Sequence, residues 1–554
     1  MPLRELAFDR FYDYEELTEL LHAWAGERPE LLEVESIGRS WAGREIWLCT
    51  LTNRETGPPL EKPAIIVEGN IHSVEWTGST AALHLVRRLL DGHPLLDERT
   101  VYVIPRLNPD GAEVSLREGR FVRSSVRPYP LAEQPDGLRM QDIDGDGRVL
   151  SMRIPDPNGP WKPHADDARV LVRREPDDLE GEFYRLYQEG VIENFDGVTI
   201  KVAPPLEGLD LNRNFPGDWD TENVQLGAGP YPTSEPEIRA YVQAVVDRPN
   251  VVAHIAYHTF SGVHLRPYSG RPDDEMPTDD LHMFKLIGEK GTSLTGYPTL
   301  SIFHDFKYHP KQILRGGVHE WLYEQLGILT WTTEFWSPQR AAGVEVANPI
   351  GWLQDHPPDD DVAIVRWFER EVGDGAFVDW YPFDHPQLGR VELGGWDVVR
   401  YWFNVPFSRL EQEIEPHTEW ALFQLALAPR LGLRAVEAEP VGSGAWRIRA
   451  VVENSGWLPT AVTRKAVERK AVRPVEVELG LPEGARLAAG ERKVELGQLE
   501  GRSMFRSTLW WGNDPSTNDL AKLEWVVEAP EGGVVRVEAR HQRAGVARAE
   551  VELS

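Results

Sequence analysis

Cysteine is almost absent from this sequence of 554 residues, which contains a single one, Cys49. One thiol cannot pair within the chain, so internal disulfides and zinc modules built on several cysteines are excluded. A metal site in this protein would therefore have to use histidine and carboxylate ligands.

Long apolar runs are missing too. No stretch reaches the roughly 18 apolar residues that a membrane-spanning helix needs. The first residues, 1–6, lack the basic-then-apolar pattern of a signal peptide. We therefore expect no membrane partner and a cytoplasmic location.

Positive charge is scarce relative to negative charge. Lys and Arg total 59 against 89 Asp and Glu, which gives a formal net charge of −30. Because a phosphate backbone is repelled by such a surface, nucleic acid is excluded as a natural partner. Hydrophobic residues make up 41% of the chain, a share typical of folded domains with packed cores.

Short apolar runs alternate with helical patterns over residues 1–431. The expected strands are 64–67, 101–104, 251–256 and 328–331. The expected helices cover about 77–90 and 407–427, and two more open with capping-box patterns at Asp13/Glu16 and Ser234/Glu237. This alternation predicts an α/β catalytic domain with a mixed central sheet and helices on both faces.

Two segments depart from that alternation. Residues 129–203 are rich in Asp, Pro, Gly and Arg, and we expect an insertion with little regular structure. From 432 to 554, apolar and polar residues alternate between turn signals such as 454–456. This pattern predicts an all-β sandwich domain that begins near residue 431.

A possible metal site follows the strand expected at 64–67. His72 and Glu75 are spaced so that both can reach one ion, and His258 follows the strand expected at 251–256. Imidazole and carboxylate suit Zn²⁺, and three protein ligands leave a fourth position for water. An H-x-x-E pair is common by chance, so these residues alone leave surface or core polar roles open.

Further motifs occur in a fixed order along the chain. They are Asn108-Pro109-Asp110-Gly111, Asp210-Leu211-Asn212-Arg213-Asn214-Phe215, Ser234-Glu235-Pro236-Glu237 and Thr332-Thr333-Glu334-Phe335. Together with His72, Glu75 and His258, they make the sequence resemble the zinc carboxypeptidases, the carboxypeptidase A-like metallopeptidases of family M14, over about residues 8–430.

The resemblance implies a metallocarboxypeptidase with one zinc ion per chain, held by His72, Glu75 and His258, and a peptide substrate with a free C-terminus. Glu334 matches the general base that takes a proton from the zinc-activated water and passes it to the leaving amine. Arg123 matches the arginine that stabilises the oxyanion.

The resemblance also assigns three residues of the Asp210–Phe215 motif. Asn212 and Arg213 match the pair that binds the terminal carboxylate of the substrate, a task for which a planar guanidinium is suited. Asp210 matches the carboxylate that orients a zinc-binding histidine.

Two departures from the family concern substrate specificity. The mobile tyrosine of the family is replaced at its expected spacing by Gln312, and Tyr308, four residues earlier, is the candidate substitute. His319 stands where relatives that select basic side chains carry Asp. Arg315 and His319 would favour an acidic or polar substrate side chain.

Asp142, Asp144 and Asp146 form the D-x-D-x-D-G head of a calcium loop. Oxygen ligands at alternate positions can surround Ca²⁺. The twelfth position is Arg153 rather than Glu, so a structural calcium site and a metal-free Asp/Gly turn are both open.

Three functions remain open from the sequence. The leading one is a zinc-dependent metallocarboxypeptidase. The second is a zinc amidase or peptidase acting on a non-standard substrate such as a cell-wall peptide. The third is a non-catalytic peptide-binding module. The oligomeric state is left open.

Overall fold

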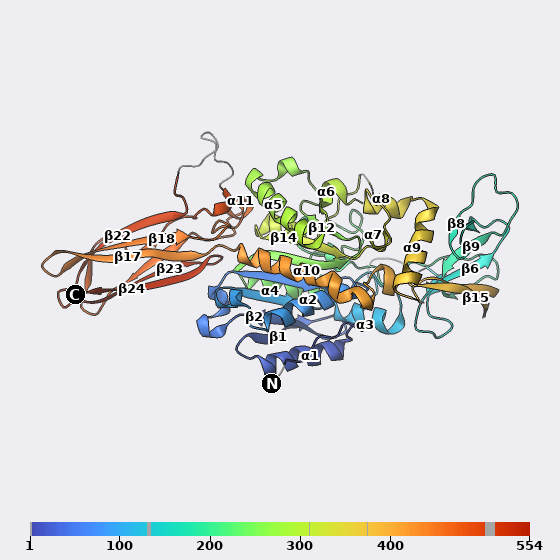
Figure 1. The fold of residues 1–554 in the computed structure, drawn as a ribbon, viewed down its shortest axis with the longest axis horizontal. Coiled ribbons are helices and arrows are strands. Elements are labelled where there is room, and N and C mark those ends of the chain that lie inside the picture. The colour runs from blue at the N-terminus through green and yellow to red at the C-terminus, as the bar shows by residue number, and fades with distance from the viewer. Residues whose placement is uncertain (1–2, 130–134, 308, 310, 374, 505–515) are drawn as a thin grey trace.

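The computed structural model describes residues 3–129, 135–307, 309, 311–373, 375–504 and 516–554. A mixed α/β body occupies the middle of the molecule (Figure 1). The β-rich region that carries the C-terminus extends from one end of this body, and short strands of the insertion lie at the other end.

The central sheet has eight strands in the order β1-β2-β4-β3-β11-β14-β12-β13. Their bounds are β1 (Leu32–Arg39), β2 (Glu45–Leu51), β3 (Ala64–Gly69), β4 (Thr100–Ile104), β11 (Val251–Thr259), β12 (Val263–Arg266), β13 (Thr299–Ser301) and β14 (Leu329–Phe335). The inner strands β4, β3, β11 and β14 run parallel. β1 and β2 pair antiparallel with their neighbours, and β12 pairs antiparallel with β14 and parallel with β13. The expected mixed sheet and its four expected strands are confirmed.

Continuous burial explains why the inner strands are visible in the sequence. Every residue of β3, β4 and β11 is buried. Parallel strands that are covered on both faces are unbroken apolar runs rather than alternating ones. The carboxyl ends of these strands share one edge of the sheet, where the candidate site lies.

Helices cover both faces of this sheet, as expected. The helices of residues 1–431 are α1 (Tyr14–Glu27), α2 (Trp76–Leu89), α3 (Pro109–Glu118), α4 (Pro236–Val246), α5 (Thr278–Thr295), α6 (Ile302–Asp305), α7 (Pro338–Ala341), α8 (Pro349–Gln354), α9 (Pro358–Glu371) and α10 (Phe407–Ala426). The core on one face includes Trp24 of α1 and Trp420 of α10. The core on the other face includes Tyr241 of α4.

The two predicted helix caps had different outcomes. At α1 the capping box is present, because Asp13 accepts from the backbone N–H of Glu16 at 2.9 Å. The cap predicted at Ser234 is wrong, since α4 begins at Pro236 with Glu235 at the cap position and no side-chain cap. The reason is tertiary: the Glu237 carboxylate accepts from the backbone of Trp41 at 2.8 Å instead of folding back on its own helix.

The prediction of little regular structure in residues 129–203 is wrong. This segment contains β5 (Leu138–Met140), β6 (Ser151–Pro155), β7 (Trp161–Pro163), β8 (Leu171–Arg173), β9 (Tyr184–Gln188) and β10 (Gly190–Ile192). β6 pairs with β16 (Gly389–Trp396), which in turn pairs with β15 (Phe377–His385), in a six-stranded sheet. Because these partners are more than 200 residues apart in the chain, local periodicity could not reveal them.

The C-terminal region is rich in β-structure. One four-stranded sheet contains β17 (Leu431–Gly442), β18 (Ala445–Asn454), β22 (Leu520–Glu528) and β20 (Arg486–Ala489). The other contains β21 (Lys493–Glu495), β19 (Glu476–Gly480), β23 (Gly533–His541) and β24 (Gly545–Leu553). Ile448 and Trp525 of the first sheet share a core with Val477 and Val537 of the second. The short helix α11 (Arg464–Glu468) lies between β18 and β19 in the chain.

Membrane-spanning segments were also sought among the helices. Within the described residues, none of them combines the length and the apolar character needed to cross a bilayer.

Candidate metal centre and active site

Three side chains meet at the carboxyl edge of the central sheet. His72 lies in the loop after β3, Glu75 precedes α2, and His258 is on β11. The Nδ1 atom of His72 is 2.9 Å from Glu75 Oε1, and the Nδ1 atom of His258 is 3.0 Å from Glu75 Oε2. The two Nδ1 atoms are 3.1 Å apart, and all three residues are buried.

The spacing of these atoms fits a zinc ion. Tetrahedral zinc with bonds of about 2.0–2.1 Å separates its ligand atoms by about 3.3 Å, close to the 2.9–3.1 Å observed between these three groups. Although burial raises the pKa of Glu75, the adjacent His72 and His258 lower it well below its usual range. Glu75 is therefore an ionised carboxylate suited to a cation.

Asp210 connects His72 to Arg123. It precedes the short 3₁₀ helix η4 (Leu211–Arg213), and its carboxylate is 3.2 Å from His72 Nε2 and accepts from Arg123 Nε at 3.0 Å. Burial opposes its ionisation, but the charges of Arg123, Arg213 and His72 hold its pKa well below the usual range. An ionised Asp210 favours a proton on His72 Nε2, which leaves the Nδ1 lone pair for a metal.

Glu334 lies beside His258 on the neighbouring strand. The parallel register of β11 and β14 places the two residues opposite each other. Burial raises the pKa of Glu334 well above its usual range, the charge of Glu75 raises it further, and Arg123 lowers it. This carboxylate is thus next to the ligand set and inclined to take up a proton, as a general base requires.

One cavity, which we call the central cavity, brings these groups together. Around its polar side lie His72, His258, Glu334, Arg123, Asn212 and Arg213. The remaining lining residues are Leu265, Ser269, Ile302, Phe306, Leu314, Gly317, His319, Glu320 and Thr332. Most of this second group was missed by sequence reasoning, because it comes from β12, α6 and loops without any motif.

The position of Asn212 and Arg213 depends on a close approach by residues 316–317. Asn212 Oδ1 accepts from the backbone N–H of Val318 at 3.0 Å, and the carbonyl of Gly316 accepts from Phe215 at 2.9 Å. Gly316 has a φ of 66°, and a Cβ there would lie 2.2 Å from the carbonyl oxygen of Arg213. Glycine is therefore required at this contact.

His319 and Arg315, both expected to influence specificity, are placed differently. His319 lines the central cavity with its Nε2 2.7 Å from Thr332 Oγ1, and burial lowers its pKa to about 3, so it is neutral. Arg315 is outside the lining residues, and its guanidinium donates to Asp218 at 2.7 Å. The third specificity candidate, Tyr308, falls outside the described residues.

The candidate calcium loop brings its three aspartates together, with ligand atoms of Asp142, Asp144 and Asp146 within 4.8 Å of one another. The Asp142 carboxylate accepts from the backbone of Gly145 at 2.6 Å and of Gly147 at 2.8 Å. A metal-free turn makes the same bonds, so calcium stays a prediction.

Comparison with known proteins agrees with this geometry. The family profile described as zinc carboxypeptidase matches residues 17–346, more than half of the chain. The chain belongs to the zinc carboxypeptidase family. A domain family of unknown function matches residues 430–552.

Individual zinc carboxypeptidases are distant in sequence. Carboxypeptidase B of Astacus astacus is 23% identical over 279 residues, which are 49% of this chain and 69% of that protein. The zinc carboxypeptidase of Saccharothrix mutabilis subsp. capreolus is 26% identical over 343 residues, 60% of this chain and 63% of that protein. The chain thus spans less than two thirds of several relatives that it matches, including 19% of human carboxypeptidase Z.

Solved structures are similar over about two thirds of this chain. Carboxypeptidase A from Helicoverpa armigera has a TM-score of 0.41 and 17% identity, covering 67% of this chain and 76% of its own. Bovine thrombin-activatable fibrinolysis inhibitor, in complex with tick carboxypeptidase inhibitor, has a TM-score of 0.40 and 16% identity, covering 66% and 98%.

Proposed function

We propose that this zinc carboxypeptidase family member is a zinc-dependent metallocarboxypeptidase that hydrolyses the C-terminal bond of peptides, with Glu334 as general base. One observation carries the proposal. His72 and His258 of the metal-binding set, the adjacent carboxylate of Glu334 and the Asn212–Arg213 pair line a single cavity. Each of these three parts has a separate task in removing a terminal residue.

Substrate binding is assigned to the cavity residues that are not metal ligands. Arg213 and Asn212 would bind the terminal carboxylate, because a guanidinium can donate two parallel hydrogen bonds to it. The last side chain of the substrate would enter among Leu265, Ile302 and Leu314. Since binding of the terminal carboxylate fixes the position of the substrate peptide in the cavity, the scissile bond is the last peptide bond of the substrate.

Proton transfer is assigned to Glu334. A zinc ion held by His72, Glu75 and His258 would supply a Lewis acid and lower the pKa of water. Glu334 accepts the proton of the attacking water and delivers it to the nitrogen of the leaving residue, so the products are a new carboxylate and a free amino acid. Arg123, fixed by its bond to Asp210, stabilises the negative charge on the carbonyl oxygen.

The side-chain preference follows from the part of the cavity wall formed by Leu265, Ile302, Leu314 and His319. His319 is uncharged, and the guanidinium of Arg315 pairs with Asp218 outside the cavity. An acidic substrate side chain against this wall would lose its hydration, and the two lining cations, Arg123 and Arg213, are assigned to the carbonyl oxygen and the terminal carboxylate. We propose a preference for uncharged, mainly apolar terminal residues.

Two other functions use the same residues. A zinc amidase or peptidase acting on a cell-wall peptide would keep Glu334 but not need Arg213. A peptide-binding module would need Arg213 but not Glu334. The presence of both residues at one cavity favours the carboxypeptidase over either alternative.

Metal dependence tests the proposal. Purified protein should contain one zinc per chain and release the terminal residue of N-blocked dipeptides that end in Leu or Phe. A chelator should abolish release, and added Zn²⁺ should restore it. Fully loaded protein that binds these peptides without cleaving them would instead support the peptide-binding module.

A further inference from the structure

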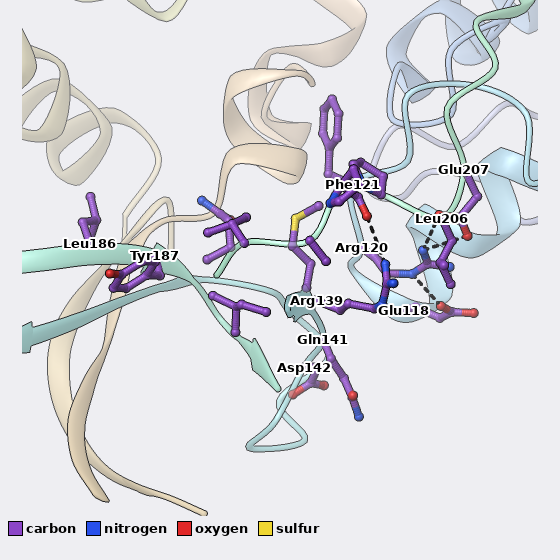
Figure 2. Close-up of a pocket in the computed structure, with 17 residues that line it drawn as sticks. Glu118, Arg120, Phe121, Arg139, Gln141, Asp142, Leu186, Tyr187, Leu206 and Glu207 are labelled. Carbon is purple, nitrogen blue, oxygen red and sulfur yellow. Dashed lines mark hydrogen bonds and ion pairs between the residues drawn. The ribbon is translucent and has the colours of Figure 1, made fainter. Parts of the chain in front are cut away.

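A second cavity lies between the α/β body and the insertion, and we call it the insertion cavity. It is lined by residues 118–121 after α3, by parts of β5 and β9, and by 202–207 (Figure 2). Its volume of about 900 Å³ falls within the 300–1,000 Å³ typical of ligand sites. Among the described residues, its lining shares no member with the central cavity.

The insertion cavity is close to the central cavity. Phe121 lines the first and Arg123 lines the second. Two residues of extended chain span at most about 7 Å. The Phe121 ring is 5.3 Å from that of Phe403, which is 5.1 Å from Phe260, two residues beyond His258. A row of aromatic rings thus connects the insertion cavity to the end of β11, the strand that carries His258.

The two arginines that line the insertion cavity are already paired with carboxylates, and the lining Asp142 accepts from the backbone N–H groups of Gly145 and Gly147. Arg120 donates to Glu207 at 3.0 Å and to Glu118 at 3.2 Å, and Figure 2 shows these bonds converging on its guanidinium. Arg139 donates to Glu193 at 2.6 Å. Ionic ligands would have to break these pairs, so the chemistry of the cavity favours an uncharged ligand.

Apolar side chains supply much of the remaining lining. They include Phe121, Leu138, Met140, Leu186, Val202 and Leu206. Val202 is 67% exposed and Leu206 is 42% exposed. Large apolar groups that remain in water at the rim of a cavity are typical of a binding surface.

We propose that the insertion cavity binds the part of a peptide substrate that precedes the scissile bond, and that it selects uncharged, apolar segments there. This inference rests on the proposed carboxypeptidase activity. An extended peptide rises about 3.3 Å per residue, so a chain that passes Arg123 reaches Phe121 within about two residues. Residues from about the third position before the scissile bond would enter the insertion cavity.

Substrate length gives the test. Two substrates share the same terminal dipeptide: one is N-blocked at that dipeptide, and the other is an octapeptide with Leu, Val and Phe upstream. We expect kcat/KM to be at least tenfold higher for the octapeptide. In the double variant V202E/L206E that ratio should fall close to one, because two charges now line an apolar cavity.

Val198→Glu is the matched control. Val198 also lies in the insertion and is 85% exposed, but it is outside the lining of the insertion cavity. This variant should keep the wild-type ratio of the two kcat/KM values. An octapeptide with Glu and Lys upstream should gain little over the short substrate.

A binding measurement separates this inference from the proposed activity. The fluorescein-labelled apolar octapeptide is titrated into the Glu334→Gln protein, with and without V202E/L206E, and anisotropy gives Kd. We expect at least tenfold weaker binding with the two added charges. Equal Kd values, or equal kcat/KM for short and long substrates, would overturn the inference. Absence of cleavage with a Kd that still depends on Val202 and Leu206 would overturn only the carboxypeptidase activity.

Discussion

Glu75, which is buried, and Glu334, which is partly exposed, are carboxylates at the same edge of the sheet, yet their surroundings shift their pKa values in opposite directions. Glu75 touches two imidazoles, which lower its pKa. Glu334 instead faces the charge of Glu75, which adds to the effect of burial and raises its pKa. Because the pKa of Glu75 is lowered and that of Glu334 is raised, Glu75 is suited to bind a metal and Glu334 to act as a base.

Glu334→Gln tests this division of roles. The amide has nearly the same shape but cannot take up the proton, so turnover of a dipeptide substrate should fall by about 10²–10⁴-fold. Zinc content, measured by atomic emission, should stay at one per chain. Glu345→Gln, on the exposed surface, should leave both values unchanged. Full activity of the Glu334 variant would contradict its role as the base.

Asp210→Asn tests the support of the metal site. Its carboxylate lies 3.2 Å from His72 Nε2 and accepts from Arg123. An amide lacks the negative charge that orients the imidazole, and loss of such a partner weakens metal binding by about 10–100-fold. Competition with a chromogenic chelator measures zinc affinity. Asp218→Asn, which removes the charged partner of Arg315, should keep wild-type affinity.

At the scale of elements, the loop at 316–317 determines how η4 presents Arg213. A Cβ on Gly316 would lie 2.2 Å from the Arg213 carbonyl oxygen. Gly316→Ala should therefore displace this element and raise KM at least tenfold for peptides with a free C-terminus, with a smaller change in kcat. Steady-state kinetics measures both constants.

Gly343→Ala is the control that distinguishes displacement of η4 from backbone strain. Gly343 also has a positive φ, 77°, but a Cβ there meets nothing within 4 Å. Both variants carry the strain of alanine in the left-handed region, whereas only Gly316→Ala pushes on η4. A KM increase of the same size in both variants would contradict the proposed role of the loop.

The first turn of α4 makes stability depend on pH. Burial raises the pKa of Glu237 to about 7, the backbone N–H of Trp41 lowers it, and Asp110 and Glu235 raise it. The folded pKa thus exceeds the value of about 4.3 for an unfolded glutamate. This group stabilises the fold fully below about pH 4.3, and its contribution is lost as the pH rises through about 7.

Glu237→Gln should flatten that dependence. At pH 8 the variant should be more stable than the wild type by on the order of 2 kcal/mol, because the buried charge is gone. The two proteins should differ little at pH 4.5. Urea unfolding at both pH values measures the difference, and equal stability of the two proteins at pH 8 would contradict the raised pKa of Glu237.

Local sequence patterns revealed some elements and not others. The inner strands were predictable because burial on both faces makes them unbroken apolar runs, and α10 was predictable from its amphipathic pattern. The strands of the insertion were not, since β6 is completed by β16 from the other end of the α/β region. The side of the central cavity formed by Leu265 and Ile302 carries no sequence motif. Arg315 was wrongly expected to influence substrate specificity, because its pairing with Asp218 is a tertiary contact that the sequence does not reveal.

At the scale of the molecule, Arg543 joins the β-rich C-terminal region to the α/β body. It is buried, which lowers its pKa to about 9, and it donates to the carbonyls of Leu326, Gly327 and Ala461. Leu326 and Gly327 precede β14, the strand that carries Glu334. We propose that residues 432–554 form a domain whose role is to stabilise the catalytic domain, residues 1–431.

Arg543→Ala tests that role. Three carbonyls lose this donor, and two of these bonds are buried, so the free energy of unfolding should fall by about 2–4 kcal/mol. KM of a short substrate should not change, because the contact is remote from the central cavity. The control is Arg536→Ala, because the Arg536 side chain is 74% exposed. Calorimetry should show the same stability for this variant as for the wild type. Unaltered stability of the Arg543 variant would contradict a stabilising interface.

Whether Arg213 and Asn212 bind a terminal carboxylate determines whether this protein is a carboxypeptidase. The most direct measurement compares two peptides that are identical except for a free acid or an amide at the C-terminus, digested by the zinc-loaded protein and read by mass spectrometry with and without chelator. We expect the free acid to lose single residues from its C-terminus at least 100-fold faster than the amide, and only without chelator. Equal cleavage of both peptides, or cleavage at internal bonds, would contradict the proposed function.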